Sequence, residues 1–257
     1  MWTDFLTPLR ILLRGLALLL ILLTLMPVTV LCQSPWAAAR KRGGRGLDER
    51  SLGFWSRCLL RVFGVRLLQR GAVVDGPLLV VANHISWLDI MALHGVAAMG
   101  FVAKAEIRDW PVLGFLATRG GTIYHRRGSH DSSTGVMHAM LTRLQQGGRV
   151  AVFPEGGILP GEHISPFHAR MFAVAVEAGC PVQPVMLRYL RDGRRDPDLT
   201  FLRGENFVGN LFRLLGRPGC LVELVCMAPF AVAGRPRREL AEQAFKLINE
   251  AYEAGLK

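Results

Sequence analysis

The stretch Leu78-Leu-Val-Val-Ala-Asn-His84-Ile-Ser86-Trp-Leu-Asp89 joins a predicted strand to a predicted helix and decides the fold of the chain. Its first five residues, 78–82, form a short continuous apolar run, which is typical of a strand covered on both faces. Ser86 and Asp89 have the spacing of a capping box, so the helix is expected to begin with Ser86 as its N-cap. His84 and Asp89 are then expected at the carboxyl end of the strand, the edge at which open parallel sheets bind their ligands.

The pair formed by His84 and Asp89 suits general base catalysis. Neutral imidazole has an ordinary pKa of about 6.5 and accepts a proton near neutral pH. A carboxylate on its other ring nitrogen fixes the tautomer and stabilises the imidazolium that forms. The nucleophile in such a site can be a hydroxyl group of the substrate. The structural alternative is that Asp89 only caps the helix and His84 hydrogen-bonds a loop.

Four segments follow one another along the chain in a recognisable order. They are Asn83-His84-Ile-Ser86-Trp-Leu-Asp89, Gly121-Thr-Ile-Tyr-His-Arg126, Phe153-Pro-Glu155-Gly156 and Val182-Gln-Pro184-Val. They resemble the N-H-x-S-x-x-D, G-x-I-x-x-R, F-P-E-G and V-P-V-x-P-V blocks of the glycerolipid acyltransferase family, which includes the 1-acylglycerol-3-phosphate acyltransferases. The resemblance covers residues 78–189 and implies that the chain is an acyltransferase.

The resemblance also implies roles for individual residues. His84 is matched to the catalytic base and Asp89 to the carboxylate that orients it. The implied substrate-binding residues are Asn83, Ser86, Lys104, Gly121, Arg126, Glu155 and Gly156. Arg126 corresponds to the arginine of the acceptor-phosphate site, and a guanidinium group binds phosphate through two parallel hydrogen bonds. The plainer alternatives are a solvated Lys104, a surface arginine at a strand end and a turn carboxylate at Glu155.

One block departs from the family pattern. The family usually continues F-P-E-G with Thr and then Arg or Ser, whereas this chain continues with Gly157-Ile158-Leu159. A polar or cationic contact to the acceptor is therefore missing, unless another arginine such as Arg170 replaces it. Otherwise the acceptor is expected to carry less negative charge than lysophosphatidic acid.

The implied function is that of a membrane-bound O-acyltransferase, which moves a fatty acyl group from a thioester of acyl-carrier protein or coenzyme A to the free hydroxyl of a lysolipid. The favoured acceptor is 1-acyl-sn-glycerol-3-phosphate, which gives phosphatidic acid, and the alternative is a lyso-ornithine lipid or another lysolipid. No cofactor and no metal are expected. The hypotheses from other classes are a non-catalytic membrane-binding protein and a nucleic-acid binder, whose aromatic and basic strand motifs are missing.

The composition agrees with attachment to a membrane. The chain has 257 residues, of which 51% are hydrophobic, and a formal net charge of +11. Such a basic balance favours either nucleic acid or an anionic membrane surface, and the apolar segment near the N-terminus favours the membrane. The five cysteines show no C-x-x-C pairing, which indicates buried thiols in a reducing compartment.

Residues 15–32 are uncharged and almost wholly apolar, and as a helix they would extend about 27 Å, close to the hydrocarbon thickness of about 30 Å. Arg10 and Arg14 precede this segment, and Arg40-Lys41-Arg42 follows it. A cleaved signal peptide is the rival interpretation, but a basic run directly after residues 37–39 opposes export. The larger basic cluster places the catalytic domain on the cytoplasmic face, as in a bacterial inner membrane, and leaves open whether the anchor spans or dips back.

Three parts are expected along the chain: a membrane anchor (1–33), a basic linker with an amphipathic helix (34–75) and an α/β acyltransferase domain (76–257). In the helix expected at residues 50–63, Trp55 and Phe63 share one side, while Arg57 and Arg61 share the opposite side. This pattern suits either a helix in the headgroup layer or an ordinary helix packed on the domain. From residue 78 onward strands and helices alternate, which predicts a central, mostly parallel sheet flanked by helices.

Overall fold

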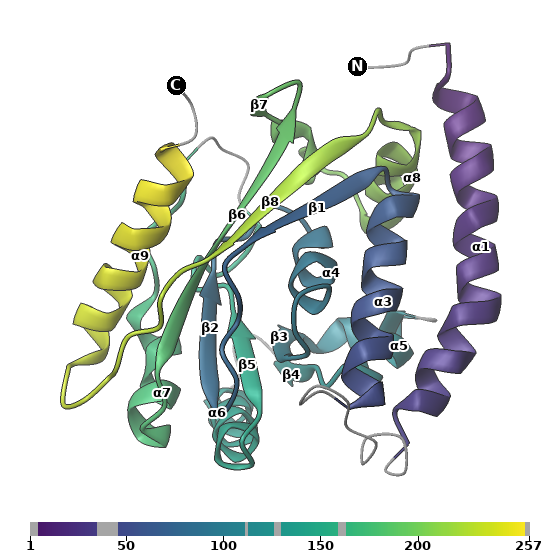
Figure 1. Cartoon of the computed structure of the whole chain (residues 1–257). Helices are drawn as coiled ribbons and strands as arrows, with labels where there is room; N and C mark the ends of the chain where they lie inside the picture. Colours follow the sequence, from purple (N-terminus) through teal and green to yellow (C-terminus); the bar gives the residue numbers. More distant parts are fainter. Residues whose placement is uncertain (1–4, 35–45, 111–112, 126–129, 159–162, 255–257) are drawn as a thin grey trace.

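Strands that are buried along their whole length form the middle of the molecule. In the computed structural model, which describes residues 5–34, 46–110, 113–125, 130–158 and 163–254, β2 (Leu78–Ala82) and β5 (Arg149–Val152) are buried at every position. The two strands pair in parallel, and helices cover both faces of the sheet (Figure 1). A strand between two helical layers needs apolar side chains on both faces, which explains the continuous apolar run at residues 78–82.

Within the described residues, the sheet has eight strands, ordered β1-β8-β6-β2-β5-β3-β4, with β7 paired to β6. The other strands are β1 (Val65–Arg70), β3 (Gly100–Lys104), β4 (Ile123–His125), β6 (Val182–Arg191), β7 (Arg194–Arg195) and β8 (Cys220–Cys226). The five strands from β6 to β4 are parallel, β8 runs antiparallel to β6, and β1 is parallel to β8. The expected central, mostly parallel sheet flanked by helices is confirmed.

A helical layer lies on each face of this sheet. One layer contains α1 (Thr7–Cys32), α3 (Leu47–Val62), α4 (Leu88–His94) and α8 (Phe207–Gly216). The opposite layer contains α6 (His130–Gln145), α7 (Ala173–Ala178) and α9 (Arg237–Glu253), as Figure 1 shows. The short elements are η1 (Ala105–Asp109), α5 (Leu113–Arg119), η2 (Ala169–Phe172) and η3 (Pro197–Leu199).

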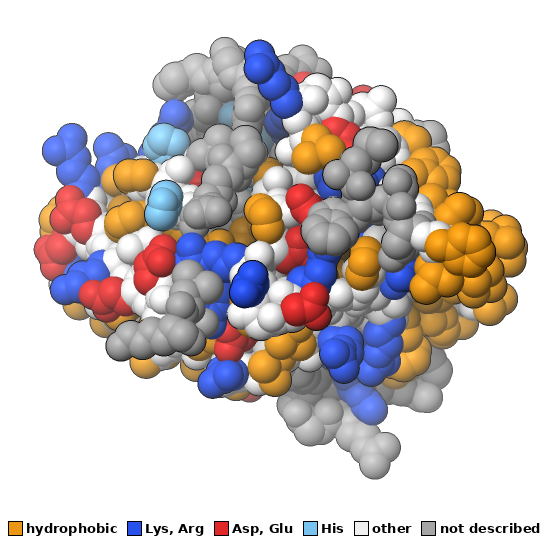
Figure 2. Space-filling view, turned by 90° about the horizontal axis from the view of Figure 1, so that it is seen from above, with side chains coloured by type: hydrophobic (Ala, Val, Ile, Leu, Met, Phe, Trp, Pro, Cys, Tyr) orange, Lys and Arg blue, Asp and Glu red, His pale blue; other side chains and the backbone are white. Residues whose placement is uncertain are grey.

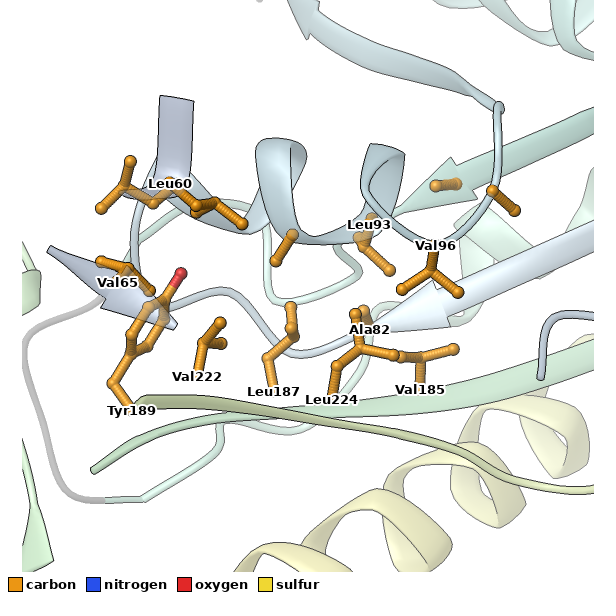
Figure 3. Close-up of a cluster of buried hydrophobic side chains, with 14 of the residues drawn as sticks. Leu60, Val65, Ala82, Leu93, Val96, Val185, Leu187, Tyr189, Val222 and Leu224 are labelled. Atoms are coloured by element: carbon orange, nitrogen blue, oxygen red, sulfur yellow. The ribbon is translucent and has the colours of Figure 1, made fainter. Parts of the chain in front are cut away.

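Alternate residues of each central strand feed two separate cores. Leu78, Val80 and Ala82 of β2 pack in the core beneath α3 and α4, whereas Leu79 and Val81 pack in the core beneath α6, α7 and α9. Figure 3 shows the first core, with side chains of β6 and β8 facing the helices. This alternation follows from the two-residue repeat of a strand and fixes β2 at the centre of the molecule.

The packing shows no boundary at residue 76, where the sequence separates a linker and helix from the α/β domain. β1, at residues 65–70, is an edge strand of the central sheet and pairs with β8. Trp55 and Phe63 of the preceding segment are only 5% and 4% exposed, so the apolar face of α3 is buried against the domain. The structure therefore agrees with the alternative of an ordinary packed helix, and not with a helix that places these two aromatic rings in the headgroup layer.

α1 is attached to the domain along one side only. Its inward face contributes Ile11, Leu18 and Ile21 to the edge of the core, while Arg14 Nη1 donates hydrogen bonds to the carbonyl oxygens of Leu215 and Arg217 at 3.0 and 2.7 Å. Leucines line the outward face, and Figure 2 shows the resulting hydrophobic surface at the end of the molecule where α1 lies. Among the described helices, α1 alone is long and apolar enough to cross a membrane.

Candidate active site

The predicted site residues follow neighbouring strands at their carboxyl ends. Val81 of β2 pairs with Val152 of β5, so His84 and Glu155, each three residues further along, leave the sheet side by side. Lys104 is the last residue of β3, the next strand across. Because parallel strands end at one common edge, the structure brings His84 and Glu155 together there and places Lys104 at the same edge.

His84 and Asp89 are in direct contact. The Nδ1 atom of His84 lies 2.9 Å from Oδ2 of Asp89, and the Asp89 side chain is fully buried. The imidazole ring stacks on Phe153 with a centroid distance of 3.9 Å and an interplanar angle of 11°. About 15% of the His84 side chain is exposed, and no hydrogen bond to its Nε2 occurs within the described ranges. The ring is thus fixed by Asp89 and Phe153, and the other ring nitrogen is available to a substrate.

Asp89 accepts hydrogen bonds on both carboxylate oxygens. Besides His84, its Oδ2 receives the backbone N–H groups of Ile85 at 2.7 Å and Ser86 at 2.9 Å. Its Oδ1 receives the hydroxyl of Tyr189 at 2.8 Å. A carboxylate that is removed from water needs such donors to remain ionised. The site therefore holds Asp89 as a fixed partner for the imidazole.

The local fold differs slightly from the capping box expected at Ser86. α4 begins at Leu88 with Trp87 as its N-cap, one residue later than the sequence predicts. The buried Ser86 Oγ still accepts from the Leu88 N–H, at 3.4 Å, and Asp89 in the first turn reaches back to the chain before the helix. The reciprocal bonding of a capping box is thus present in shifted form.

Glu155 links the loop of His84 to a more distant segment. Its Oε1 accepts the backbone N–H of His84 at 2.7 Å, and its Oε2 accepts the backbone N–H of Ser165 at 3.0 Å. Burial raises the pKa of Glu155, and these two backbone hydrogen bonds oppose that shift. Gly156 follows in a left-handed conformation with φ of 81°, and the ring of His168 lies 3.3 Å from the position that its Cβ would take.

Asn83 fastens the end of β2 to β6. Its Nδ2 donates to the carbonyl oxygen of Leu187 at 2.9 Å, and its Oδ1 accepts the Leu187 N–H at 2.8 Å. The side chain is 1% exposed, so these contacts continue the sheet ladder beyond the last residue of the strand. A contact of Asn83 or of the buried Ser86 with substrate stays a prediction.

The remaining predicted residues lie further from the pair. Lys104 is exposed, and Gly121, with φ of 78°, lies against the guanidinium group of Arg143, which would have to move to admit a side chain at this position. Arg126 lies outside the described residues, directly after the end of β4. Within the described ranges, no group of three or more His, Cys, Asp or Glu side chains is arranged to hold a metal ion.

The sequence did not point to Phe153 and Tyr189 as parts of the site. Phe153 belongs to a recognised block, and its position after a buried strand could have suggested a contact with the histidine that follows β2. Tyr189 is 100 residues from Asp89 in sequence and carries no local signal. Its role depends on the pairing of β2 with β6, which one sequence does not reveal.

A histidine–carboxylate pair at the carboxyl edge of an α/β sheet, with an open ring nitrogen, is an arrangement that suits general base catalysis. The protein-family model Acyltransferase matches residues 60–188, the part of the chain that contains both residues of the pair and Glu155. The chain belongs to the acyltransferase family, and the expected enzyme class is confirmed.

Relatives and a solved structure agree with this assignment. The lyso-ornithine lipid O-acyltransferase of Pseudomonas aeruginosa is 37% identical over 205 residues, which are 80% of this chain and 79% of that protein. The 1-acyl-sn-glycerol-3-phosphate acyltransferase of Neisseria gonorrhoeae is 35% identical over 154 residues, 60% of this chain and 56% of the relative. The crystal structure of the 1-acyl-sn-glycerophosphate acyltransferase of Thermotoga maritima, at 22% identity, has the same fold with a TM-score of 0.70 over 96% of this chain and 97% of that one.

Proposed function

We propose that the protein transfers a fatty acyl group from a thioester to the free hydroxyl of a lysolipid, with His84 as general base. The observation that carries the proposal is the contact of His84 Nδ1 with the buried Asp89, which leaves Nε2 open. A base held in this orientation activates a substrate hydroxyl without a nucleophile from the protein.

The reaction then proceeds by direct attack of the acceptor hydroxyl on the thioester carbonyl. His84 Nε2 accepts the hydroxyl proton while the oxygen attacks the carbonyl carbon. The carbon–sulfur bond breaks, and the imidazolium returns the proton to the leaving thiolate. Asp89 stabilises the imidazolium between these two proton transfers. The products are an ester and a free thiol, and no acyl-enzyme forms.

The acceptor belongs to the lysolipids, and two observations favour a lyso-ornithine lipid. The relative with this named acceptor is matched over 79% of its length, whereas the matched 1-acyl-sn-glycerol-3-phosphate acyltransferase is covered over 56%. The chain also has Ile158 where the family often places a cationic or polar residue. An ornithine head group carries one carboxylate and one ammonium and needs fewer cationic partners than a phosphate monoester, whose charge is about −1.5 to −2. 1-Acyl-sn-glycerol-3-phosphate, which the sequence alone favours, is the second candidate.

Arg126 and Lys104 are proposed to receive the anionic part of the acceptor. β4, which ends directly before Arg126, lies three strands from β2 in the sheet order. At about 4.8 Å between strands, this places the end of β4 roughly 14 Å from that of β2. Arg126 follows β4 in sequence, and its proposed contact with the head group rests on the resemblance of residues 121–126 to the family's G-x-I-x-x-R block.

We further propose that α1 holds the enzyme on one leaflet of a membrane. α1 packs lengthwise beside α3, whose exposed face carries Arg50, Arg57 and Arg61. If α1 spanned a bilayer, these arginines would enter the hydrocarbon, which is costly. A helix lying in the interface buries its outward leucines in lipid and keeps the arginines among anionic head groups. The catalytic domain is assigned to the cytoplasmic side, where acyl-carrier protein and coenzyme A thioesters are available as acyl donors.

Purified full-length protein tests this proposal in lipid vesicles. The assay combines each acyl donor, acyl-carrier protein or coenzyme A thioester, with lyso-ornithine lipid or 1-acyl-sn-glycerol-3-phosphate. The proposal expects ester formation with at least one acceptor and a higher kcat/KM for the lyso-ornithine lipid. A higher kcat/KM for the glycerol phosphate contradicts the acceptor assignment, and the lack of acyl transfer with all four pairs contradicts the function.

A further inference from the structure

The catalytic pair has a third member that comes from a distant strand. Tyr189 on β6 is 2% exposed, and its hydroxyl donates to Asp89 Oδ1 at 2.8 Å. Asp89 Oδ2, the other carboxylate oxygen, contacts His84. We propose that Tyr189 is a positioning residue of acyl transfer, which sets the orientation and charge distribution of Asp89 and acts through it on His84.

The contact controls the orientation of the carboxylate. Oδ2 is held by the chain just before α4, through His84 and the N–H groups of Ile85 and Ser86. Tyr189 is the hydrogen-bond donor to Oδ1 within the described ranges. Without this hydroxyl, the buried Oδ1 would lose its partner, and the carboxylate would be held through one oxygen only.

The position of the Tyr189 hydroxyl is fixed because its residue lies on β6, a strand of the central sheet. Asn83 bonds both backbone groups of Leu187, so β6 is fixed to the end of β2 directly before the catalytic loop. Tyr189 lies two residues beyond Leu187 and projects from the same face of β6, toward the helical layer (Figure 3). The register between β2 and β6 thereby sets the distance from the phenol to Asp89.

The surroundings of Tyr189 favour its neutral form, which donates the hydrogen bond. Burial, the charge of Asp89 and the hydrogen bond to it hold the pKa of Tyr189 well above its usual value. Cys220 of β8 also interacts with the phenol, and burial raises the pKa of that thiol to about 12, so it stays uncharged. Glu155 from the end of β5 interacts with both His84 and Asp89. Of these groups, Tyr189 is the one whose hydroxyl donates a hydrogen bond to Asp89.

Removing the hydroxyl changes the balance of charge in a defined direction. The Tyr189 hydrogen bond draws the negative charge of Asp89 toward Oδ1. In Tyr189→Phe, more of that charge acts on the imidazole, so the imidazolium is favoured over the neutral ring. Since His84 must be neutral to accept a proton, the acid limb of kcat/KM moves upward, by about 0.3 to 1 pH unit.

The rate should fall as well, because the loosened carboxylate orients His84 less well. We expect a loss in kcat of about three- to thirty-fold. This loss is smaller than the one expected from removing a whole charge-assisted contact, because Asp89 keeps its hydrogen bonds on Oδ2. The KM for the acceptor should stay within about two-fold, since the fully buried phenol does not contact substrate.

Tyr252→Phe is the matched control, because Tyr252 is also buried, at 7% exposure, but lies on α9 in the opposite helical layer. Both variants and the wild type are assayed as full chains for kcat, KM, pH profile and melting temperature. In parallel, the rate at which diethyl pyrocarbonate modifies His84, read by mass spectrometry of its peptide, reports the neutral imidazole without any substrate.

The inference rests on the proposed function for the role of His84, but the modification experiment separates the two. The positioning role is supported if the pH profile of His84 modification moves to higher pH in Tyr189→Phe and not in Tyr252→Phe. If the wild type is active, a lower kcat of Tyr189→Phe is expected as well. If the wild type transfers no acyl group while the pH profile of His84 modification still shifts in Tyr189→Phe, the proposed function fails. The effect of Tyr189 on His84 through Asp89 is then still supported. The inference is overturned if the pH dependence of His84 modification is the same in all three proteins. This holds even if Tyr189→Phe loses activity, because a loss that only follows its melting temperature reflects a structural role.

Discussion

Asp89 illustrates at the residue scale how the fold stabilises a charge inside its core. The side chain is fully buried, yet its two oxygens receive hydrogen bonds from two backbone N–H groups, an imidazole and a phenol. Burying an ionised carboxylate without such donors would cost several kcal/mol of folding free energy. The same hydrogen bonds that offset this cost also fix the orientation of the carboxylate toward His84, so folding and the proposed chemistry depend on one set of contacts.

Glu155→Gln distinguishes a positioning role from direct contact with the acceptor. Both oxygens of Glu155 accept backbone N–H groups, from His84 and Ser165. A glutamine retains one acceptor and turns an NH₂ group toward the second N–H, so the loop of His84 should shift. We expect kcat to fall about ten- to a hundred-fold and the melting temperature to drop, with little change in the acceptor KM.

The control for this change is Glu177→Gln, which alters an exposed carboxylate on α7. Steady-state kinetics of both variants provide the comparison. A raised acceptor KM with an unchanged kcat in Glu155→Gln would show instead that this carboxylate binds the acceptor, as the family resemblance implies.

At the scale of elements, one face of α1 contacts the domain and the other is exposed. Arg14 and Ile11 face the domain, whereas Leu16 and Leu20 point outward with 57% and 62% exposure. Replacing both leucines by aspartate should weaken binding to vesicles by about ten-fold or more, because each change removes apolar burial and adds a charge in the lipid. The melting temperature should not change, since both positions are on the outward face.

Val176→Asp on α7, where the valine is 43% exposed, serves as the control on the opposite layer. Vesicle flotation at high salt is the measurement, because salt suppresses residual attraction between the arginines of α3 and anionic lipid. Equal flotation of the double variant and the wild type would refute the attachment through α1.

The start of α8 depends on a carboxylate whose ionisation links stability to pH. Glu205 accepts hydrogen bonds from Arg213, from Asn210 and from the Leu202 N–H. The Arg213 hydrogen bond is the main cause that lowers the pKa of Glu205 from 4.5 to about 2. Because the folded value lies below the unfolded one, this stabilisation is present above pH 4.5 and is lost as the pH falls toward 2.

Glu205→Gln should therefore lower the free energy of unfolding at pH 7, and the difference from wild type should shrink below about pH 4.5. Denaturant titrations between pH 7 and 3 measure this dependence. Glu239→Gln, on α9, breaks an ion pair with Arg235 at the surface and should have little effect at any pH. A constant deficit of Glu205→Gln across the whole range would contradict the role of its charge.

At the scale of the molecule, the sequence predicts those parts of the fold that are local. The apolar run at residues 78–82, the turn that carries His84 and Asp89, and the glycines that end α6 are signals within one short segment. The alternation of strands and helices that the sequence predicts from residue 78 onward is observed for this reason. The contact between His84 and Asp89 is local too, since the two residues are five positions apart in sequence.

Features that depend on distant pairing could not be read in this way. β1 is a strand because it pairs with β8 more than 150 residues later, and its own sequence is mixed apolar and basic. α8 is amphipathic, but its apolar face has meaning only beside α1 and the core. The apolar face of α3 is compatible with lipid or protein, and only the folded neighbours decide between them. The contact of Tyr189 with Asp89 cannot be predicted from the sequence for the same reason.

The central claim is that His84 is the base of an acyl transfer, and the most direct test compares His84→Ala with the wild type. Both proteins are purified at full length and assayed with the best acyl donor and acceptor, with His163→Ala, which removes an exposed imidazole, as the control. We predict that His84→Ala keeps its melting temperature within a few degrees and loses a factor of about 10² to 10⁴ in kcat/KM, while the control retains wild-type activity. Turnover of His84→Ala at the wild-type rate would contradict the claim.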